Sequence, residues 1–397
     1  MEPLARAARR DRAPPRPDPR RPPRRLAQAD AQHERPRAPR RRRDRLRADP
    51  RCAPLGRPVR PGDLLRRRAR RLALAGRPAS ARRARDRSAE EDAVDRVCVV
   101  GAGVIGSLFA GHLGRVAEVT VLTRREEHAE ALNAEGLRVS GRHDFVTRVR
   151  AATDPAALPE PELAIVATKT TELAAAAARL EGHWPRAAVM TVQNGLGAEA
   201  AFPGRRVLSA VTFMSGTRHS DTHVEYILDT ETWLGPYGET PYELAEEVAA
   251  LIVESGLKAQ AFPDLRPAQW SKLIFNATVN AVAALTGLPH DHHFADREHP
   301  GDLGNLVYGL VEEGKRVADA SGVELHEDPW EMNVLATRRG SRHYPSMLED
   351  VEARRPTEIE HITGALVREA GKAGVEVPLH TALYRLVRGR EASWEPD

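Results

Sequence analysis

The chain has 397 residues, arginine supplies 55 of its 60 basic residues, and only two cysteines are present. This length allows two or three domains, and two cysteines exclude a disulfide-rich scaffold or a cysteine-based zinc site. Residues 1–95 carry a net charge of +17, whereas residues 96–397 carry −13 and contain all 18 aromatic residues. No run approaches the roughly 20 apolar residues of a membrane span, and no signal-peptide pattern opens the chain. We therefore expect a cytoplasmic protein without a membrane partner.

The first 95 residues are rich in arginine and proline and contain no aromatic side chain. Such a segment cannot bury enough apolar surface to offset the entropy lost on ordering, so we expect a disordered extension, or sequence translated from a start codon placed too early. A nucleic-acid-binding arm and an organelle transit peptide are the alternatives. The absence of interleaved aromatic residues disfavours the first, and the many prolines and acidic residues disfavour the second. No nucleic-acid partner is therefore expected.

Ordered structure is predicted to begin with residues 96–100 (RVCVV), a β-branched run typical of a buried strand in which Cys98 is a small core residue. A glycine-rich turn, residues 101–106 (GAGVIG), follows directly and leads into a helical pattern. Residues 118–123 (EVTVLT) are then predicted as a second strand. A GxGxxG motif between a strand and a helix is typical of a dinucleotide-binding βαβ unit.

Further strands are predicted at residues 163–168, 188–192 and 207–213, with a helix at residues 171–180 between the first two. This alternation indicates a parallel, doubly wound sheet. Residues 224–236 have the pattern of edge strands or a hairpin.

Strand patterns cease after about residue 265, and only helical patterns follow. The predicted helices cover residues 269–285, 303–321, 330–338, 346–353, 358–373 and 378–388. We therefore predict an α/β protein, with a Rossmann-type domain over residues 96–264 and an all-helical domain over residues 265–397.

The three glycines of the GxGxxG turn have separate expected roles. Gly101 permits the tight turn, Gly103 lets the backbone approach a pyrophosphate, and Gly106 lets helix and strand pack closely. With Val104 and Ile105 they form a helix N-terminus, whose free N–H groups favour an anion.

The end of the second strand indicates which dinucleotide binds. An NAD site has an acidic residue there, but here Arg124 follows the strand. Because a guanidinium suits a 2′-phosphate in charge and geometry, we predict NADPH as the cofactor. The alternative is that Arg124 is one more solvated arginine.

Lysine is rare, and unlike arginine it can lose its proton when its pKa is lowered, so each lysine is informative. Lys169 follows the strand at residues 163–168, at the carboxyl edge where such sheets bind ligands. Lys272 lies in an apolar helix that also carries Asn276 and Asn280, and four-residue spacing places the three along one side. They either form the polar floor of a substrate site or specify packing by bonding other protein groups.

Three further polar positions have two interpretations each. Asn194 follows the strand at residues 188–192 and lies either at a ligand site or in a plain Asn-Gly turn. Ser346 and Glu358 both stand at the start of a predicted helix, within capping-box patterns. From spacing alone, the favoured roles are an N-cap for Ser346 and a first-turn carboxylate facing the helix dipole for Glu358.

A histidine-rich segment, residues 289–294 (PHDHHF), raises the question of a metal site. Its residues are adjacent rather than four apart on a helix, and no cysteine or glutamate accompanies them. We expect an exposed loop and no metal.

The ordered segments GAGVIG, VATKTTE, VQNGLG, WSKLIFNATVN, PSMLEDVEARRPTEIE and GVEVPLH resemble the ketopantoate reductases (2-dehydropantoate 2-reductases). The resemblance extends from about Val97 to Arg388. It implies NADPH-dependent reduction of 2-dehydropantoate to pantoate, in pantothenate and coenzyme A biosynthesis, with a small-molecule 2-oxo acid as substrate. A homodimer is compatible with this expectation.

The resemblance also assigns roles to individual residues. Lys272 matches the catalytic acid of the family, and Glu358 matches a glutamate that assists it. The residues that match substrate-binding positions are Asn194, Asn276, Asn280 and Ser346. The residues that match cofactor-binding positions are Gly101, Gly103, Val104, Ile105, Gly106, Arg124, Lys169 and Asn194.

The chain departs from the family pattern after Glu358. The family usually has an aromatic residue and an asparagine there, whereas this chain has His361 and Thr363. Two alternatives therefore stay open: an NADP-dependent reductase of a related 2-oxo acid, and a non-enzymatic NADPH-sensing Rossmann protein.

Overall fold

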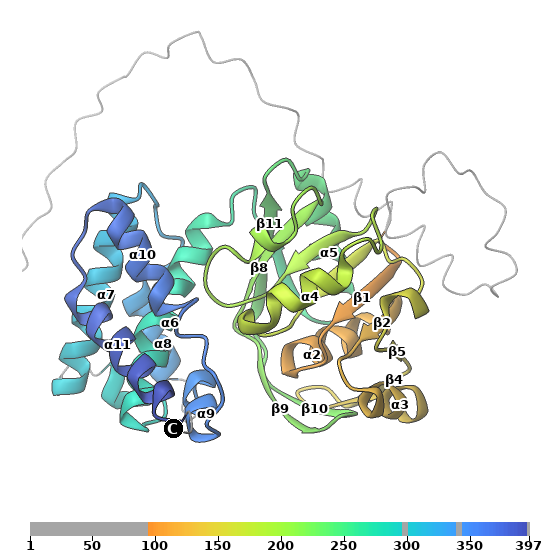
Figure 1. Ribbon diagram of the computed structural model, residues 1–397, viewed down its shortest axis with the longest axis horizontal. Coiled ribbons are helices and arrows are strands. Elements are labelled where there is room, and N and C mark those ends of the chain that lie inside the picture. The colour runs from red at the N-terminus through yellow and green to blue at the C-terminus, as the bar shows by residue number, and fades with distance from the viewer. Residues whose placement is uncertain (1–93, 296–300, 339–343, 395–397) are drawn as a thin grey trace, which may run out of the picture. The chain divides into compact units, whose positions relative to one another are not determined.

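The computed structural model describes residues 94–295, 301–338 and 344–394, which all belong to one compact unit (Figure 1). The predicted extension, residues 1–95, lies outside the described residues except for its last two. Val94 is buried, and its backbone N–H donates a hydrogen bond to Glu247 Oε1 at 2.8 Å. The packed region therefore already includes Val94, ahead of the first strand.

An eight-stranded sheet forms the first part of the described chain, with the strand order β12-β11-β8-β7-β6-β1-β2-β5. The strands are β1 (Arg96–Val100), β2 (Glu118–Leu122), β5 (Arg150–Ala152), β6 (Leu163–Val166), β7 (Ala188–Thr191), β8 (Val207–Thr212), β11 (Glu231–Tyr237) and β12 (Lys258–Ala261). The strands from β5 to β8 in this order are parallel, and β11 runs antiparallel to β8. The predicted parallel, doubly wound sheet is confirmed.

Helices and short turns connect these strands and cover both faces of the sheet. They are α2 (Val104–Leu113), α3 (Glu126–Glu135), α4 (Leu173–Leu180), α5 (Tyr242–Glu254) and the 3₁₀ turns η2 (Pro155–Ala157), η3 (Thr170–Glu172) and η4 (Ala198–Ala201). In β1, Val97 and Val99 pack into the core beneath α2 and α5, while Cys98 and Val100 pack into the core beneath α4. Burial on both faces explains why such strands have continuous apolar sequences, and it raises the pKa of Cys98 to about 12.

A second, four-stranded sheet has the order β4-β3-β10-β9. Its strands are β3 (Leu137–Gly141), β4 (Phe145–Thr147), β9 (Ser215–Ser220) and β10 (His223–Leu228). The helix α2 contacts strands of both sheets and approaches this one closely, because a Cβ added to Gly111 would lie 2.6 Å from Val139 Cγ2. The small sheet therefore packs on the helix that follows the GxGxxG turn.

The prediction of edge strands or a hairpin at residues 224–236 is wrong. The strand β10 lies between β3 and β9 in the small sheet, and β11 lies between β8 and β12 in the large one. The two segments separate although both contribute to the core around α2, β10 through Val224 and Tyr226 and β11 through Leu234, while Trp233 of β11 packs against Leu265 on the other face of the large sheet. The apolar pattern of a strand therefore does not predict which other strand it will pair with.

The remaining described chain is helical and surrounds one central helix, α6 (Arg266–Thr286) (Figure 1). The others are η5 (His292–Phe294), α7 (Asp302–Ala320), α8 (Pro329–Arg338), α9 (Ser346–Glu352), α10 (Thr363–Ala373) and α11 (Pro378–Ala392). Contacts from α7, α8, α9, α10 and α11 all reach α6, which explains why its sequence is apolar nearly all round. Within the described ranges, no helix combines the length and apolar character that crossing a membrane requires.

Candidate active site

The GxGxxG turn has the geometry that its glycines require. Gly101 has φ +96°, and a Cβ added to Gly106 would lie 1.9 Å from the carbonyl oxygen of Gly101, so helix α2 and the turn meet without room for a side chain. A Cβ on Gly103 would meet nothing within 4 Å. The turn is therefore open at Gly103, where Val104 and Ile105 begin α2 and its free N–H groups favour an anion.

Two buried polar atoms lie without a hydrogen-bond partner at the carboxyl edge of the parallel strands, within the described structure. They are Thr168 Oγ1, after β6, and Gln193 Oε1, after β7. The Gln193 Nε2 group donates to the carbonyls of Val166 at 2.8 Å and Thr168 at 3.0 Å, which fixes the amide. Unsatisfied buried polar atoms are rare because they are costly, so these two are suited to a polar ligand. Together with the open turn, they fit a bound dinucleotide.

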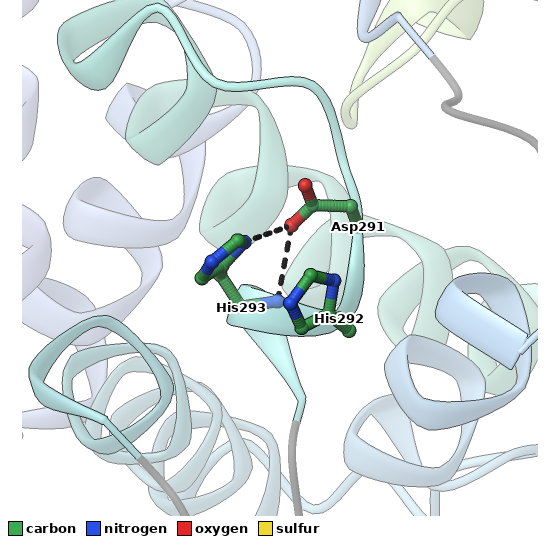
Figure 2. A group of neighbouring side chains, drawn as sticks. All are labelled: Asp291, His292 and His293. Carbon is green, nitrogen blue, oxygen red and sulfur yellow. Dashed lines mark hydrogen bonds and ion pairs between the residues drawn. The ribbon is translucent and has the colours of Figure 1, made fainter. Parts of the chain in front are cut away.

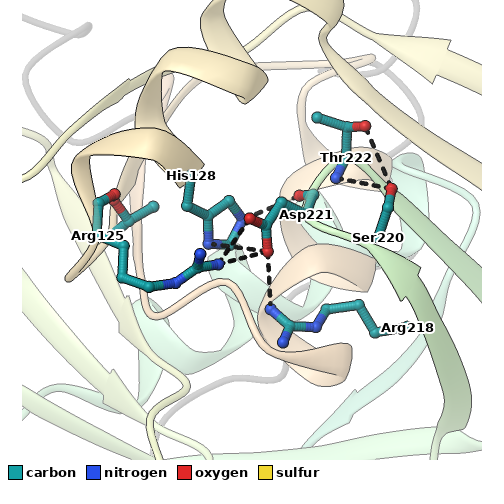
Figure 3. Close-up of polar contacts among 7 residues, drawn as sticks. Arg125, His128, Arg218, Ser220, Asp221 and Thr222 are labelled. Carbon is teal, nitrogen blue, oxygen red and sulfur yellow. Dashed lines mark hydrogen bonds and ion pairs between the residues drawn. The ribbon is translucent and has the colours of Figure 1, made fainter.

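Arg124, at the end of β2, is exposed and forms an ion pair with Glu172 of η3, with Nη1 2.5 Å from Oε1. Its neighbour Arg125 binds both carboxylate oxygens of Asp221, at 2.5 and 2.6 Å. Figure 3 shows that His128 and Arg218 also face this carboxylate, which lies in the turn between β9 and β10. The two adjacent arginines thus contact carboxylates from different parts of the sheet domain.

Lys272 is buried on α6 and reaches the end of β8. Its Nζ donates a hydrogen bond to the carbonyl oxygen of Thr212 at 2.5 Å and lies 5.1 Å from the centre of the Phe213 ring. Burial lowers the pKa of Lys272 to about 8, and attraction by the Glu358 carboxylate opposes this shift. A lysine with such a pKa stays charged at neutral pH but releases its proton more readily than a solvated lysine.

Glu358 lies in the turn before α10 and is held by groups of the sheet domain. Its Oε1 accepts hydrogen bonds from the backbone N–H of Thr170 at 2.9 Å and from the Thr170 hydroxyl at 2.8 Å. Its Oε2 accepts one from Asn194 Nδ2 at 3.1 Å. Three donors fix the carboxylate in one orientation.

The favoured roles of Ser346 as an N-cap and of Glu358 as a first-turn carboxylate are both wrong. The helix α10 begins at Thr363, five residues later than predicted, so Glu358 lies outside its first turn. The N-cap of α9 is Pro345, and no side chain caps that helix. The Glu358 carboxylate is instead satisfied by Thr170 and Asn194, which no local pattern could reveal.

Asn194 connects Glu358 to the helix of Lys272. Its Oδ1 accepts a hydrogen bond from Asn276 Nδ2 at 3.3 Å. The next residue, Gly195, has φ +93°, and a Cβ there would lie 2.0 Å from the His361 carbonyl oxygen. The tight Asn-Gly turn is therefore present, and it brings the Asn194 amide to the polar cluster; a ligand at Asn194 stays a prediction.

The other residues expected in the site are placed around this cluster. Asn280 is buried one turn further along α6, and Ser346 is exposed in the first turn of α9, which packs on α6. Lys169 Nζ lies 2.5 Å from Oδ1 of the buried Asp350 of α9. The hydrogen bonds of the structure thus join Asn194, Asn276 and Glu358, whereas Lys169 forms a separate pair.

Sequence reasoning missed Thr170, Asp350 and Glu172. All three stand inside the quoted segments VATKTTE and PSMLEDVEARRPTEIE, so a motif signal was present for them. Nothing in that motif linked Glu172 to Arg124, which lies 48 residues away in the chain. The departing residue Thr363 is fully buried and donates to the carbonyl of Ala277, so it serves packing against α6.

The histidine-rich segment forms the turn η5, and the expected exposed loop is wrong for His290 and Phe294, which are buried. Ligand atoms of Asp291, His292 and His293 lie within 4.8 Å of one another (Figure 2). The Asp291 carboxylate accepts hydrogen bonds from the His293 backbone N–H at 3.0 Å and from its Nδ1 at 2.8 Å. This carboxylate therefore caps its own turn, and the expectation of no metal stays a prediction.

Comparison with known proteins identifies the family of the chain. Residues 97–239 match the family model "Ketopantoate reductase PanE/ApbA", and residues 264–391 match "Ketopantoate reductase PanE/ApbA C terminal". The chain is 32% identical over 300 residues to a 2-dehydropantoate 2-reductase of Halobacterium salinarum, covering 74% of this chain and 98% of the relative. It is 28% identical over 305 residues to one of Pyrococcus abyssi, covering 75% and 98%.

The solved structures agree. The crystal structure of 2-dehydropantoate 2-reductase from Methylococcus capsulatus is similar, with a TM-score of 0.67 and 27% identity, covering 76% of this chain and 98% of that one. A ketopantoate reductase of Ralstonia eutropha has the same TM-score and identity, covering 75% and 99%. The chain, with its Rossmann-like sheet and helical C-terminal part, therefore belongs to the ketopantoate reductase family of oxidoreductases.

Proposed function

We propose that the protein reduces 2-dehydropantoate to pantoate with NADPH. Its relatives are named for the reduction of 2-dehydropantoate, and Arg124 at the end of β2 favours NADPH. The observation that carries the proposal is the buried ammonium of Lys272, with its pKa lowered to about 8, close enough to Glu358 to be attracted by it. Residues 96–264 would form the cofactor domain and residues 265–397 the catalytic domain. The cytoplasmic location and a homodimer stay predictions.

The dinucleotide would be held at the carboxyl edge of the large sheet. Gly101, Gly103, Val104, Ile105 and Gly106 would bind the pyrophosphate at the N-terminus of α2. When bound, the nicotinamide supplies the hydride that reduces the C2 carbonyl of a 2-oxo acid.

Three exposed or half-buried side chains would complete the cofactor site. Arg124 would bind the 2′-phosphate, and Lys169 and Asn194 would lie near the nicotinamide. Changing Arg124→Asp should reverse the preference from NADPH to NADH, because it removes the cation and adds a second carboxylate beside Glu172. Initial rates with each cofactor test this, and an unchanged ratio of kcat/KM would refute the role of Arg124.

Lys272 would act as the general acid. Its ammonium stabilises negative charge that develops on the carbonyl oxygen and then donates the proton that completes the alcohol. The Thr212 carbonyl holds the ammonium at the end of β8, and burial makes the proton easier to release. A desolvated charge is also more effective there than it would be in water.

Glu358 and the neighbouring amides would position Lys272 and the substrate. The Glu358 carboxylate is fixed by three donors, and its attraction favours the charged form of Lys272. Asn276, Asn280 and Ser346, with Asn194, would donate hydrogen bonds to the carboxylate and hydroxyl groups of the substrate. A pocket built from such donors discriminates strongly against substrates that lack the matching groups.

A related 2-oxo acid is the second candidate substrate, because His361 stands where the family usually has other residues and its carbonyl lies against Gly195. NADPH oxidation followed at 340 nm with 2-dehydropantoate and a panel of 2-oxo acids separates the two. We expect the highest kcat/KM with 2-dehydropantoate. A higher kcat/KM with another 2-oxo acid would identify that acid as the substrate instead. The absence of turnover with every acid would favour an NADPH-sensing protein.

A further inference from the structure

We propose that Glu172 determines how strongly the protein prefers NADPH over NADH, and that the site accepts both cofactors. The inference rests on the proposed function in one respect, namely that a nicotinamide dinucleotide binds at the GxGxxG turn. It concerns the adenosine end of that site and does not depend on the identity of the oxo acid.

The structure brings a carboxylate from another segment to the guanidinium of Arg124, which follows β2. Glu172 belongs to η3, which follows β6, and β6 lies two places from β2 in the sheet, next to β1. Its Oε1 lies 2.5 Å from Nη1 of Arg124. Tertiary structure thus places an acidic side chain where the local sequence predicts only a guanidinium.

These two side chains favour different cofactors. A carboxylate near the end of the second strand accepts a hydrogen bond from the 2′-hydroxyl of NADH, and a guanidinium binds the 2′-phosphate of NADPH. Arg124 contacts Glu172 through Nη1, and a guanidinium has five N–H donors, so it retains donors for a phosphate. The charge of Glu172 repels that phosphate at the same time.

Exposure allows this competition to occur. The Arg124 side chain is 70% exposed and that of Glu172 is 34% exposed, so both can exchange one partner for another without disturbing the core. An ion pair of this kind contributes little to stability. Replacing Glu172 should therefore change the cofactor preference and leave the stability of the fold nearly unchanged.

The adjacent pair formed by Arg125 and Asp221 provides a matched control (Figure 3). It also joins an exposed arginine after β2 to a carboxylate, but that carboxylate comes from the turn between β9 and β10 and faces Arg218 and His128 as well. Changing Asp221→Asn removes the same charge as Glu172→Gln. A general effect of net charge would be equal in both variants.

The test is a binding titration of the full-length protein with NADPH and with NADH, followed by the fluorescence of the reduced nicotinamide. We expect the wild type to bind both cofactors. Glu172→Gln should raise the ratio of Kd(NADH) to Kd(NADPH) about fivefold, because it removes an exposed charge that repels the doubly charged 2′-phosphate. Glu172→Ala should shift the ratio in the same direction, and Asp221→Asn less than about twofold.

Calorimetry with 2′,5′-ADP and 5′-AMP distinguishes failure of this inference from failure of the proposed function. A shift in their relative affinities in Glu172→Gln supports the role of Glu172 even if no oxo acid is reduced. An unchanged NADPH-to-NADH ratio in Glu172→Gln, an equal shift in Asp221→Asn, or a wild type that does not bind NADH would overturn the proposal.

Discussion

Replacing Lys272 by methionine tests the ammonium while keeping a straight side chain of similar length. The shift of its pKa from 10.5 to about 8 corresponds to about 3 kcal/mol, at about 1.4 kcal/mol per unit, by which the folded protein disfavours the charged form. Methionine removes the charge and also this cost, so the variant should fold. A positioned general acid contributes about 10²- to 10⁴-fold, so we expect kcat to fall by that factor while NADPH binding remains.

The pH dependence carries a second signature of the same group. Since the charged form of Lys272 donates the proton, kcat/KM should be level below pH 8 and fall tenfold per unit above the pKa of about 8. For stability, the folded pKa lies below the unfolded value of 10.5, so the unfolded state binds more protons between pH 8 and 10.5. The free energy of unfolding should therefore gain a contribution as pH rises through that window, and Lys272→Met should lack it.

The assay is NADPH oxidation at 340 nm across pH 6–10, with denaturant unfolding at matched pH values. Lys372→Met serves as the control, because that lysine is exposed on α10 and pairs only locally with Glu369. A kcat of Lys272→Met within about threefold of the wild type would remove Lys272 from the mechanism, since a positioned general acid typically contributes about 10²-fold or more. Persistence of the alkaline decline in the variant would assign that decline to another group.

Two other changes test the cofactor turn and the carboxylate. Gly106→Ala should lower the melting temperature and abolish dinucleotide binding, because its Cβ would lie 1.9 Å from a backbone oxygen. Gly103→Ala should keep the melting temperature of the wild type and only weaken binding, because its Cβ would meet open space. Equal melting temperatures of the two variants would contradict these steric roles. Glu358→Gln should lower the free energy of unfolding by about 1–3 kcal/mol. The new amide NH₂ group would face either the Thr170 N–H or the Asn194 Nδ2 group, and both of these are donors. It should also move the alkaline decline of kcat/KM to lower pH, because the carboxylate no longer favours the charged lysine; an unmoved decline with normal unfolding would argue against both roles.

Local patterns were sufficient for the cofactor turn, the central strands and the C-terminal helices, but they did not predict α3, α5, β3, β4, β5, β9 or β12. Strand β1 has the predicted bounds, because a β-branched run followed by glycine leaves few alternatives. All six helices predicted after residue 265 are present, with ends shifted by a few residues in most cases. The exception is α10, whose predicted start at Glu358 was five residues early because a capping pattern occurs there without the cap forming.

Partners far apart in the chain could not be predicted in this way. The strands β10 and β11 both bury apolar residues in the core around α2, yet they join different sheets, so their apolar patterns did not reveal the strands they pair with. The Thr212 carbonyl that holds Lys272 has no sequence signature, because every residue carries such a group.

The sequence by itself determined the central parallel strands, the helical character of the chain after residue 265, the glycine turn and the residue types available for catalysis, since these follow from steric limits and local periodicity. Only the tertiary structure decided that Glu358 bonds Thr170, that Asn276 reaches Asn194 and that Glu172 faces Arg124. Those choices depend on which surfaces meet when distant segments pack. The pKa of Lys272 is lowered by burial among several segments, so the sequence of its own helix could not predict it.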